Sequence, residues 1–274
     1  MTTLVWFKRD LRVHDHAPLA AAADLGEPVI PLYVIEPDYW QLPDTSARQW
    51  AFIQDSLEDL RRQLRRLGGD LLVMAGPITQ VLDRLTRDYD IQRVFCHQET
   101  GGQWTYDRDL AMIDWCQSRG IEFQEWQQFG VVRRLRDRDL WDKAWSHLMR
   151  QAPQAAPTRL AVPDGLGALA STASQPDLAD PAPCPDRQQG GSQRGEKLLA
   201  SFLERRCVGY QYNISSPNTA VRACSRLSPH IAYGTVSLRE IYQQAKATGQ
   251  HPNSLPRKKR SLTSFRSRLQ CLYA

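Results

Sequence analysis

The chain has 274 residues, of which 42% are hydrophobic and 24% are charged. This composition is that of an ordinary globular protein, and it excludes a collagen, a wholly disordered chain and a disulfide-rich miniprotein. No apolar run approaches the roughly 20 residues that span a bilayer, so we expect no membrane partner. The apolar run from Leu4 to Phe7 is too short for a signal peptide. The six cysteines are scattered without a CxxC pair, which indicates reduced thiols and a cytoplasmic location.

The net charge of +5 comes from 35 basic and 30 acidic residues, but it is unevenly distributed. From Ile241 to the C-terminus there is no acidic residue, whereas cations are frequent. A polyanionic partner would therefore be attracted mainly to the C-terminal end of the chain. The cations of this stretch are Lys246, Arg257, Lys258, Lys259, Arg260, Arg266 and Arg268.

Five segments of the first 130 residues are predicted to be β-strands. The first four are short, nearly continuous apolar runs, which are typical of parallel strands buried on both faces of a sheet. The fifth alternates apolar and polar residues and is a weaker prediction. The five segments are residues 4–7, 29–35, 70–76, 93–97 and 121–126.

Helical patterns lie between these strands. Residues 47–67 repeat apolar side chains at spacings of three and four, and Ser46 with Gln49 is predicted to form a capping box at the start of this helix. Further helices are predicted after Pro77 and over residues 103–119. The alternation of strands and helices predicts an α/β fold with a doubly wound, Rossmann-like parallel sheet.

The composition changes after this region. Residues 151–190 contain seven of the 17 prolines, which predicts a long surface linker. After Gly195 the pattern is helical and no further strand is predicted. We therefore expect an α/β domain over residues 1–130, an interdomain linker over 131–194 and part of an all-α domain over 195–274. We expect the protein to be a monomer.

The first predicted strand leads into a charged segment, KRDLRVHDH, at residues 8–16. Cations at the carboxyl end of a first strand lie where ligands bind such sheets, and Asp10 is suited to hold an arginine in a bidentate pair. A solvated loop with internal salt bridges is the alternative. His14 and His16 have no third ligand nearby in the sequence, so no metal site is predicted. The sequence also lacks a GxGxxG motif after this strand and a P-loop.

A second candidate segment, CSRLSPHIAYGTVS, covers residues 224–237. Ser228 is predicted to be a helix N-cap, with Pro229 at the first helical position. Ser237 and Glu240 are predicted to form a capping box for the next helix. Two helix starts rich in hydroxyl groups, next to Arg226, are suited to hold a diphosphate. The alternative is that the segment contains only two well-capped helices.

Together these segments resemble the DNA photolyase/cryptochrome family. Residues 4–16 resemble its opening, and SRLSPHIAYGTVSLRE, residues 225–240, resembles its flavin-binding segment. Arg108 and Asp109 match a recurring pair of its N-terminal domain. The resemblance implies FAD in the helical domain and an antenna pigment, a folate or a deazaflavin, in the α/β domain. It also implies a photolyase, in which light-excited reduced flavin donates an electron to a pyrimidine dimer in DNA, so that no catalytic residue of the protein is required.

The resemblance also implies individual binding residues. The turn formed by Ser225, Arg226, Leu227 and Ser228 would contact the phosphates and the ribityl chain of the flavin. An upstream tyrosine of the same site is Tyr210 or Tyr212, and we prefer Tyr210. Cys224 replaces a threonine found in many members, so a hydroxyl contact is lost or becomes a weaker thiol contact. For DNA we expect phosphate contacts from Arg257, Lys258, Lys259 and Arg260.

The resemblance ends after Leu269. Members of the family continue there with a tryptophan and several helices, whereas this sequence has QCLYA at residues 270–274. We therefore expect an incomplete flavin domain, impaired repair and weak or absent FAD binding by the isolated chain. Two other functions stay open: a cryptochrome-like blue-light photoreceptor, and a non-catalytic nucleotide- or pigment-binding α/β fragment.

Overall fold

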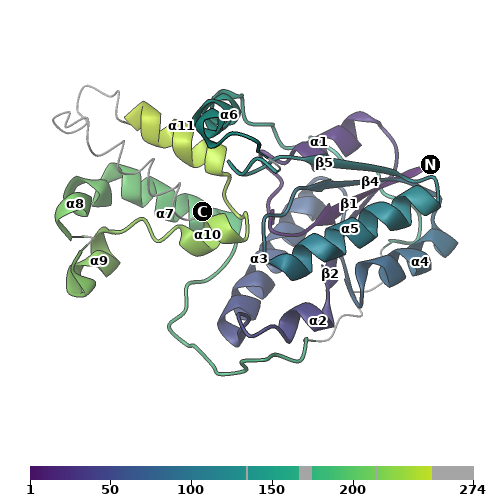
Figure 1. Cartoon of the computed structure of the whole chain (residues 1–274), viewed down its shortest axis with the longest axis horizontal. Helices are drawn as coiled ribbons and strands as arrows, with labels where there is room; N and C mark the ends of the chain where they lie inside the picture. Colours follow the sequence, from purple (N-terminus) through teal and green to yellow (C-terminus); the bar gives the residue numbers. More distant parts are fainter. Residues whose placement is uncertain (134, 167–174, 214, 249–274) are drawn as a thin grey trace.

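The computed structural model describes residues 1–133, 135–166, 175–213 and 215–248. Its α/β domain contains a five-stranded parallel sheet in the order β3-β2-β1-β4-β5, with helices on both faces (Figure 1). The strands are β1 (Thr2–Phe7), β2 (Val29–Ile35), β3 (Leu72–Ala75), β4 (Ile91–His97) and β5 (Glu122–Trp126). The helices of this domain are α1 (Ala17–Asp24), α2 (Pro37–Trp40), α3 (Ala47–Arg66), α4 (Ile78–Asp88) and α5 (Gln103–Ser118).

The apolar strands are buried because each face of the sheet carries its own hydrophobic core. Along β1, Val5 and Phe7 point into the core that α1 and α3 cover. Leu4 and Trp6 point into the opposite core, which α4 and α5 cover. A strand buried on both faces needs apolar residues at successive positions, which is the pattern of the sequence. The prediction of a doubly wound α/β sheet is therefore confirmed.

One detail at the start of α3 differs from the predicted capping box. Ser46 is the N-cap residue with an extended backbone, but in the described part of the chain its side chain makes no capping hydrogen bond. Its hydroxyl lies 3.4 Å from the Gln49 Oε1 instead. The helix is stabilised by its buried apolar stripe, which runs from Trp50 to Leu64. Burial of this stripe contributes more to the stability of the helix than a single capping hydrogen bond would.

The helical part of the chain packs around a third core that includes Trp145, Leu199, Ile231 and Ile241. Its α6 lies within the segment predicted as a linker and packs against α11. Among the described residues, no helix is both long and apolar enough to span a membrane. The elements are η1 (Arg138–Leu140), α6 (Trp141–Arg150), α7 (Ser192–Glu204), η3 (Arg206–Gly209), α8 (Tyr210–Asn213), α9 (Pro217–Ala223), α10 (Ser228–Ala232) and α11 (Leu238–Thr248).

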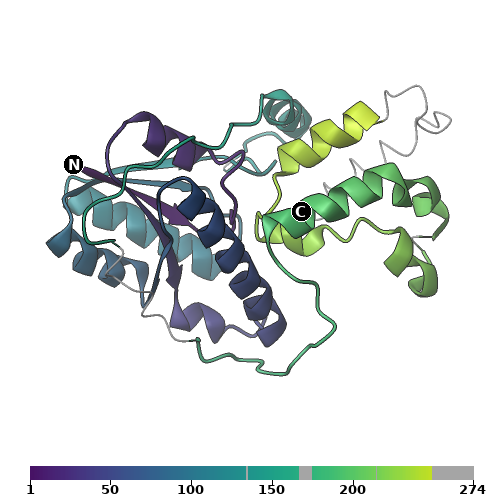
Figure 2. The ribbon, with the colours of Figure 1, turned by 180° about the vertical axis from the view of Figure 1, so that it is seen from behind.

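The connection between α6 and α7 returns across the α/β domain before it reaches the helical part again (Figures 1 and 2). Backbone hydrogen bonds fix its described portions: Leu160 N–H donates to the Leu67 carbonyl at 2.7 Å, and Ala179 N–H donates to the Trp40 carbonyl at 2.9 Å. Leu160 and Leu178 are buried in the core beneath α3. The connection is therefore part of the packed α/β domain.

The end of this connection is fastened to α3. Gly190 N–H donates to Asp55 at 3.0 Å, Gly191 N–H to the Ser56 hydroxyl at 3.1 Å and Ser192 N–H to Asp59 at 2.8 Å. These acceptors satisfy N–H groups at the start of α7 that have no partner within the helix. The bonds hold the first turn of α7 against the α/β domain.

Candidate functional site

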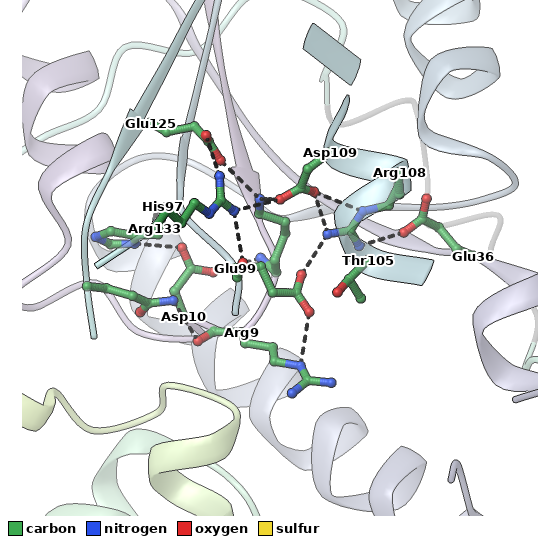
Figure 3. Close-up of polar contacts among 12 residues, drawn as sticks. Arg9, Asp10, Glu36, His97, Glu99, Thr105, Arg108, Asp109, Glu125 and Arg133 are labelled. Carbon is green, nitrogen blue, oxygen red and sulfur yellow. Dashed lines mark hydrogen bonds and ion pairs between the residues drawn. The ribbon is translucent and has the colours of Figure 1, made fainter. Parts of the chain in front are cut away.

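A network of buried ion pairs lies at the carboxyl end of the sheet (Figure 3). Its centre is Arg108 on α5, whose guanidinium contacts Glu36 at 2.9 Å, Glu99 at 2.6 Å and Asp109 at 2.8 Å. The same guanidinium lies 4.7 Å from the centre of the Trp6 ring. Because the carboxyl ends of parallel strands meet at one edge, residues far apart in sequence converge here.

The network extends from Asp109 toward the other strands. Asp109 accepts from Lys8 at 3.2 Å and from Arg133 at 3.3 Å, and Arg133 also pairs with Glu125 at 2.9 Å. Burial alone would raise the pKa of Asp109, but the charges of Lys8 and Arg108 and the hydrogen bonds they donate hold that pKa below its usual value. The carboxylate is therefore charged and compensated at neutral pH.

Asp10 has different partners from those predicted. Among the described residues no arginine pairs with it: its Oδ2 lies 2.9 Å from the His16 Nε2 and 2.8 Å from the His97 Nδ1, and its Oδ1 accepts from the Lys8 N–H at 2.7 Å. The arginine expectation was wrong because β1 pairs with β4, which brings His97 beside Asp10. All three side chains are buried.

These three residues form a hydrogen-bonded cluster whose protonation is set by its partners. The His16 Nδ1 accepts a hydrogen bond from the Leu19 N–H at 3.1 Å, at the start of α1. In a neutral imidazole the other nitrogen then carries the proton, so the His16 Nε2 donates to Asp10. That nitrogen has no free lone pair for a metal, although the three ligand atoms lie within 4.8 Å of one another. The hydrogen-bond donors and acceptors of the three residues therefore suit a structural role and not a metal site.

Acid is expected to weaken the protein through this cluster. Burial, followed by the charge of His16, lowers the pKa of His97 to about 3, against about 6.5 in an unfolded chain. A histidine with a lowered folded pKa contributes stability that is complete above its unfolded pKa and is lost as the pH falls toward the folded value. The free energy of unfolding should therefore decline as the pH falls from about 6.5, with a slope of up to about 1.4 kcal/mol per pH unit from His97.

Urea denaturation across this pH interval measures that slope. The substitution His97→Asn keeps a donor toward Asp10 but does not titrate, so it should flatten the slope by about one proton. A His97→Asn variant with the same slope as the unmodified chain would show that His97 does not carry the effect.

Two clefts border the network and the helical part. A cleft of about 540 Å³ lies between α3, residues 184–188 and α10, with Phe52 and Tyr233 among its walls and Arg48 and Ser228 lining it. A second cleft, of about 270 Å³, lies beside Arg108 and is lined by side chains that include Glu36 and Trp104. Tyr233 also borders the small cavity that contains Arg9 and Glu99. Ligand space thus exists next to both segments that the sequence singled out.

The predicted flavin-contacting turn precedes α10. Arg226 has a left-handed backbone, with φ of 59°, and the Ser225 hydroxyl accepts from the Leu227 N–H at 3.4 Å. Leu227 is buried in the third core, whereas Ser228 is exposed and lines the wide cleft. The predicted N-cap is wrong: Leu227 is the N-cap residue and Ser228 is the first residue of α10.

The remaining predicted residues make contacts of their own. Tyr210 begins α8 and packs edge-on against Phe202, with ring centres 5.6 Å apart. Tyr212 is 75% exposed. The Ser237 prediction holds in part, since its hydroxyl caps the Arg239 and Glu240 N–H groups while the Glu240 carboxylate contacts His14. The four cations predicted to bind DNA, at 257–260, lie outside the described residues.

Sequence reasoning missed His97, Glu99, Arg133 and Glu36 as members of the polar network. Their spacing in the sequence offers no signal that they meet, because they follow three different strands: Glu36 follows β2, His97 ends β4 with Glu99 two residues later, and Arg133 follows β5. Their shared position at the ends of predicted parallel strands, or just beyond, is the signal that was available.

Comparison with known proteins agrees with this architecture. Residues 3–133 match the family model described as DNA photolyase. A deoxyribodipyrimidine photo-lyase of Halobacterium salinarum is 28% identical over 267 residues, covering 89% of this chain and 54% of that protein. A cryptochrome DASH of Gloeobacter violaceus is 39% identical over 115 residues, covering 40% of this chain and 23% of that protein. This chain therefore spans about half the length of the first of these relatives and a smaller share of the second.

A solved structure shows the same fold. The crystal structure of a bacterial class III photolyase from Agrobacterium tumefaciens superposes with a TM-score of 0.78 at 20% identity, covering 98% of this chain and 57% of that one. The similarity extends through the parallel sheet and the helical part, in the order that the sequence predicts. Residues 3–133 thus match the DNA photolyase family model, and 89% of the chain is similar to a deoxyribodipyrimidine photo-lyase, so the chain is similar to members of the DNA photolyase/cryptochrome family.

Proposed function

We propose that the chain serves as a photolyase-type protein in the light-driven, FAD-dependent repair of pyrimidine dimers in DNA. The observation that carries this proposal is the alignment of 89% of the chain with a deoxyribodipyrimidine photo-lyase, which extends beyond the α/β domain. The absence of a catalytic triad or paired carboxylates from the sequence motifs fits a reaction whose chemistry resides in a cofactor.

The turn at residues 225–228 fits the diphosphate of FAD. A left-handed residue followed by a right-handed one directs successive backbone N–H groups to one side, which makes a concave site for an anion. Arg226 and Leu227 have this combination, with φ of 59° at Arg226 and of −88° at Leu227. Arg226 adds a positive charge, and the exposed Ser228 adds a hydroxyl at the edge of the wide cleft. When bound, reduced FAD would supply the electron that splits the dimer.

The wide cleft is proposed as the antenna site. Phe52 and Tyr233 offer aromatic surface to a planar ring, and Arg48 offers a positive charge to its substituents. A volume of about 540 Å³ lies within the range of ligand pockets. A folate and a deazaflavin both combine a planar ring with anionic groups, so either class fits this lining.

The isolated 274-residue chain is expected to bind FAD weakly. Val208, Tyr212 and Val221 are 50%, 75% and 58% exposed, so the helices next to the proposed flavin turn present an open surface. A ligand held from one side loses much of its burial and hence of its affinity. Titration followed by flavin fluorescence should give no tight, saturable binding. A chain that purifies with stoichiometric FAD would contradict this expectation.

Repair is tested with an oligonucleotide that contains a cyclobutane dimer, incubated with the chain and reduced FAD under blue light. Recovery of pyrimidine absorbance that depends on both light and the chain supports the photolyase proposal. Light-dependent flavin reduction without repair would instead favour the cryptochrome-like function, which the 39% identity to a cryptochrome DASH over 115 residues also supports. If neither repair nor flavin reduction is observed, the function that remains is that of a non-catalytic, pigment-binding α/β fragment.

A further inference from the structure

One side chain, Gln188, connects the wide cleft with the flavin turn, which is the turn at residues 225–228. Gln188 belongs to the end of the connection between α6 and α7 and lines the wide cleft. Its amide Nε2 donates to the Arg226 carbonyl at 2.7 Å. Ser228, the last residue of the turn, lines the same cleft. A ligand in the cleft would therefore lie next to a group that holds the turn.

The hydrogen bond from Gln188 also sets the direction of the next backbone N–H. The peptide unit between Arg226 and Leu227 is planar and trans, so its N–H points opposite to its carbonyl. With the Arg226 carbonyl held by Gln188, the Leu227 N–H faces the Ser225 hydroxyl at 3.4 Å. That distance is longer than the usual ~3 Å, so this N–H is still available to an anion.

The conformation of the turn depends on side chains that hold its carbonyls. Arg226 has a φ of 59°, which is unfavourable for a residue with a Cβ. The Arg206 guanidinium donates to the carbonyls of Cys224 and of Ser225, and Gln188 holds the third. Among the described residues, the Ser225 and Arg226 N–H groups donate to no backbone carbonyl. The turn thus presents N–H groups to a ligand while its carbonyls are occupied.

The backbone on both sides of Gln188 is fastened to α3. The Arg187 guanidinium pairs with Asp55 at 2.6 Å, and the Gly190 N–H donates to the same carboxylate at 3.0 Å. The side-chain amide of Gln188 is the part that remains free to adjust. An amide carries two N–H donors and a carbonyl acceptor, and the bond to Arg226 uses one donor. A cleft ligand can therefore contact the amide without breaking that bond.

We propose that Gln188 is a positioning residue that couples the two sites, so that a ligand in the wide cleft raises the affinity of the flavin turn for a diphosphate. The proposal rests on the proposed function, which supplies both classes of ligand. A cleft ligand that contacts the amide immobilises it where it holds the Arg226 carbonyl, and the diphosphate then binds a turn that is already ordered. By linkage, the diphosphate raises the affinity of the cleft ligand by the same factor.

The test measures binding of inorganic pyrophosphate to the full 274-residue chain by titration calorimetry, alone and with the cleft saturated. Folic acid and a 5-deazaflavin serve as the two cleft probes. A bound probe should lower the dissociation constant of pyrophosphate about fivefold, and pyrophosphate should lower that of the probe equally. Gln188→Leu should bring this factor to about one, because it removes the amide at similar size. A merely structural loss would weaken each ligand without removing the factor.

The matched control is Gln49→Leu. Gln49 lines the same cleft, and its side chain contacts the Ser46 hydroxyl. Its substitution should leave the coupling factor at about fivefold even if a cleft probe binds less tightly. Thermal melting checks that both variants are folded.

A second measurement needs no ligand, because trypsin can cut the bond between Arg226 and Leu227. Gln188→Leu should be cut there about fivefold faster, as the loss of one hydrogen bond implies. Cleavage after Arg222, on α9, should be unchanged and reports any general loosening. Gln188→Lys keeps an N–H donor and should restore the slower cleavage.

The outcomes separate the coupling from the proposed function. If both ligands bind without affecting each other, or if cleavage after Arg226 is unchanged in Gln188→Leu, the coupling is overturned and the proposed function stands. If the chain binds no pyrophosphate at millimolar concentration, the flavin site of the proposed function is overturned together with the coupling. If neither cleft probe binds, the antenna site is overturned, and the coupling with it.

Discussion

Replacing Gly234 with alanine is expected to lower the free energy of unfolding by about 3–5 kcal/mol. A Cβ at this position would lie 2.2 Å from the Arg9 carbonyl oxygen and 2.6 Å from the Asp10 Cα. Both contacts are with backbone, so neither can be relieved by rotating a side chain. The φ of 61° adds strain for any residue with a Cβ.

The substitution should disturb both parts of the protein, because Gly234 lies where the helical part meets the α/β domain. The Arg12 Nη1 donates to the Gly234 carbonyl at 2.9 Å, and the Leu11 N–H donates to the Tyr233 carbonyl at 3.1 Å. Moving the backbone away from Arg9 would break these bonds and displace Tyr233, which forms part of the wide cleft. The substitution should therefore also alter binding in that cleft.

Urea or guanidinium denaturation measures the loss, with Gly26→Ala as the matched control. Gly26 has a similar φ of 67° but nothing within 4 Å of an added Cβ, so it should lose only about 1 kcal/mol through backbone strain. Equal losses in the two variants would show that the close approach to Arg9 has no energetic consequence.

Arg108→Ala is expected to cost about 3–5 kcal/mol, because it leaves buried carboxylates without their cation. Glu36, Glu99 and Asp109 all lose a partner within 3 Å. Burial alone would lower the pKa of Arg108, but the three carboxylates outweigh it and hold the pKa well above its usual value. In the variant the pKa values of these carboxyl groups should rise, so that part of the lost stability returns as the pH is lowered and they become neutral.

Denaturation at neutral and mildly acidic pH measures both effects. Arg119→Ala is the control, since Arg119 pairs with Asp83 at 2.8 Å on the surface and also lies over Trp115. An exposed pair of this kind contributes about 1 kcal/mol or less. A loss in Arg108→Ala no larger than that of Arg119→Ala would show that the buried network is not needed for stability.

The sheet was predictable from sequence because its strands are buried on both faces. Burial of this kind leaves almost no polar position within a strand, as in residues 29–35, so the signal is local. The polar network was not predictable in the same way. Lys8 and Asp109 are 101 positions apart, and only the parallel pairing of β1 with β4 brings the ends of these elements together.

The cluster of Asp10, His16 and His97 was equally hard to predict from the sequence. His16 was considered as a ligand, but His97 was not, because nothing in the spacing of the two residues links them. The tautomer of His16 depends on a further contact, the Leu19 N–H at the start of α1. A cluster that depends on strand order and on a helix start becomes visible only after the fold is known.

The path of the connection between α6 and α7 determines how the two parts can separate. Trp145 on α6 precedes this connection, and Ile241 on α11 follows it, yet both lie in the same core. The helical body therefore includes a helix from each side of the long excursion over the sheet. A single cut within that excursion would leave two fragments that still share this core and the contacts of Gly234 with Arg9 and Arg12. We therefore expect the two fragments of a cut chain to stay associated.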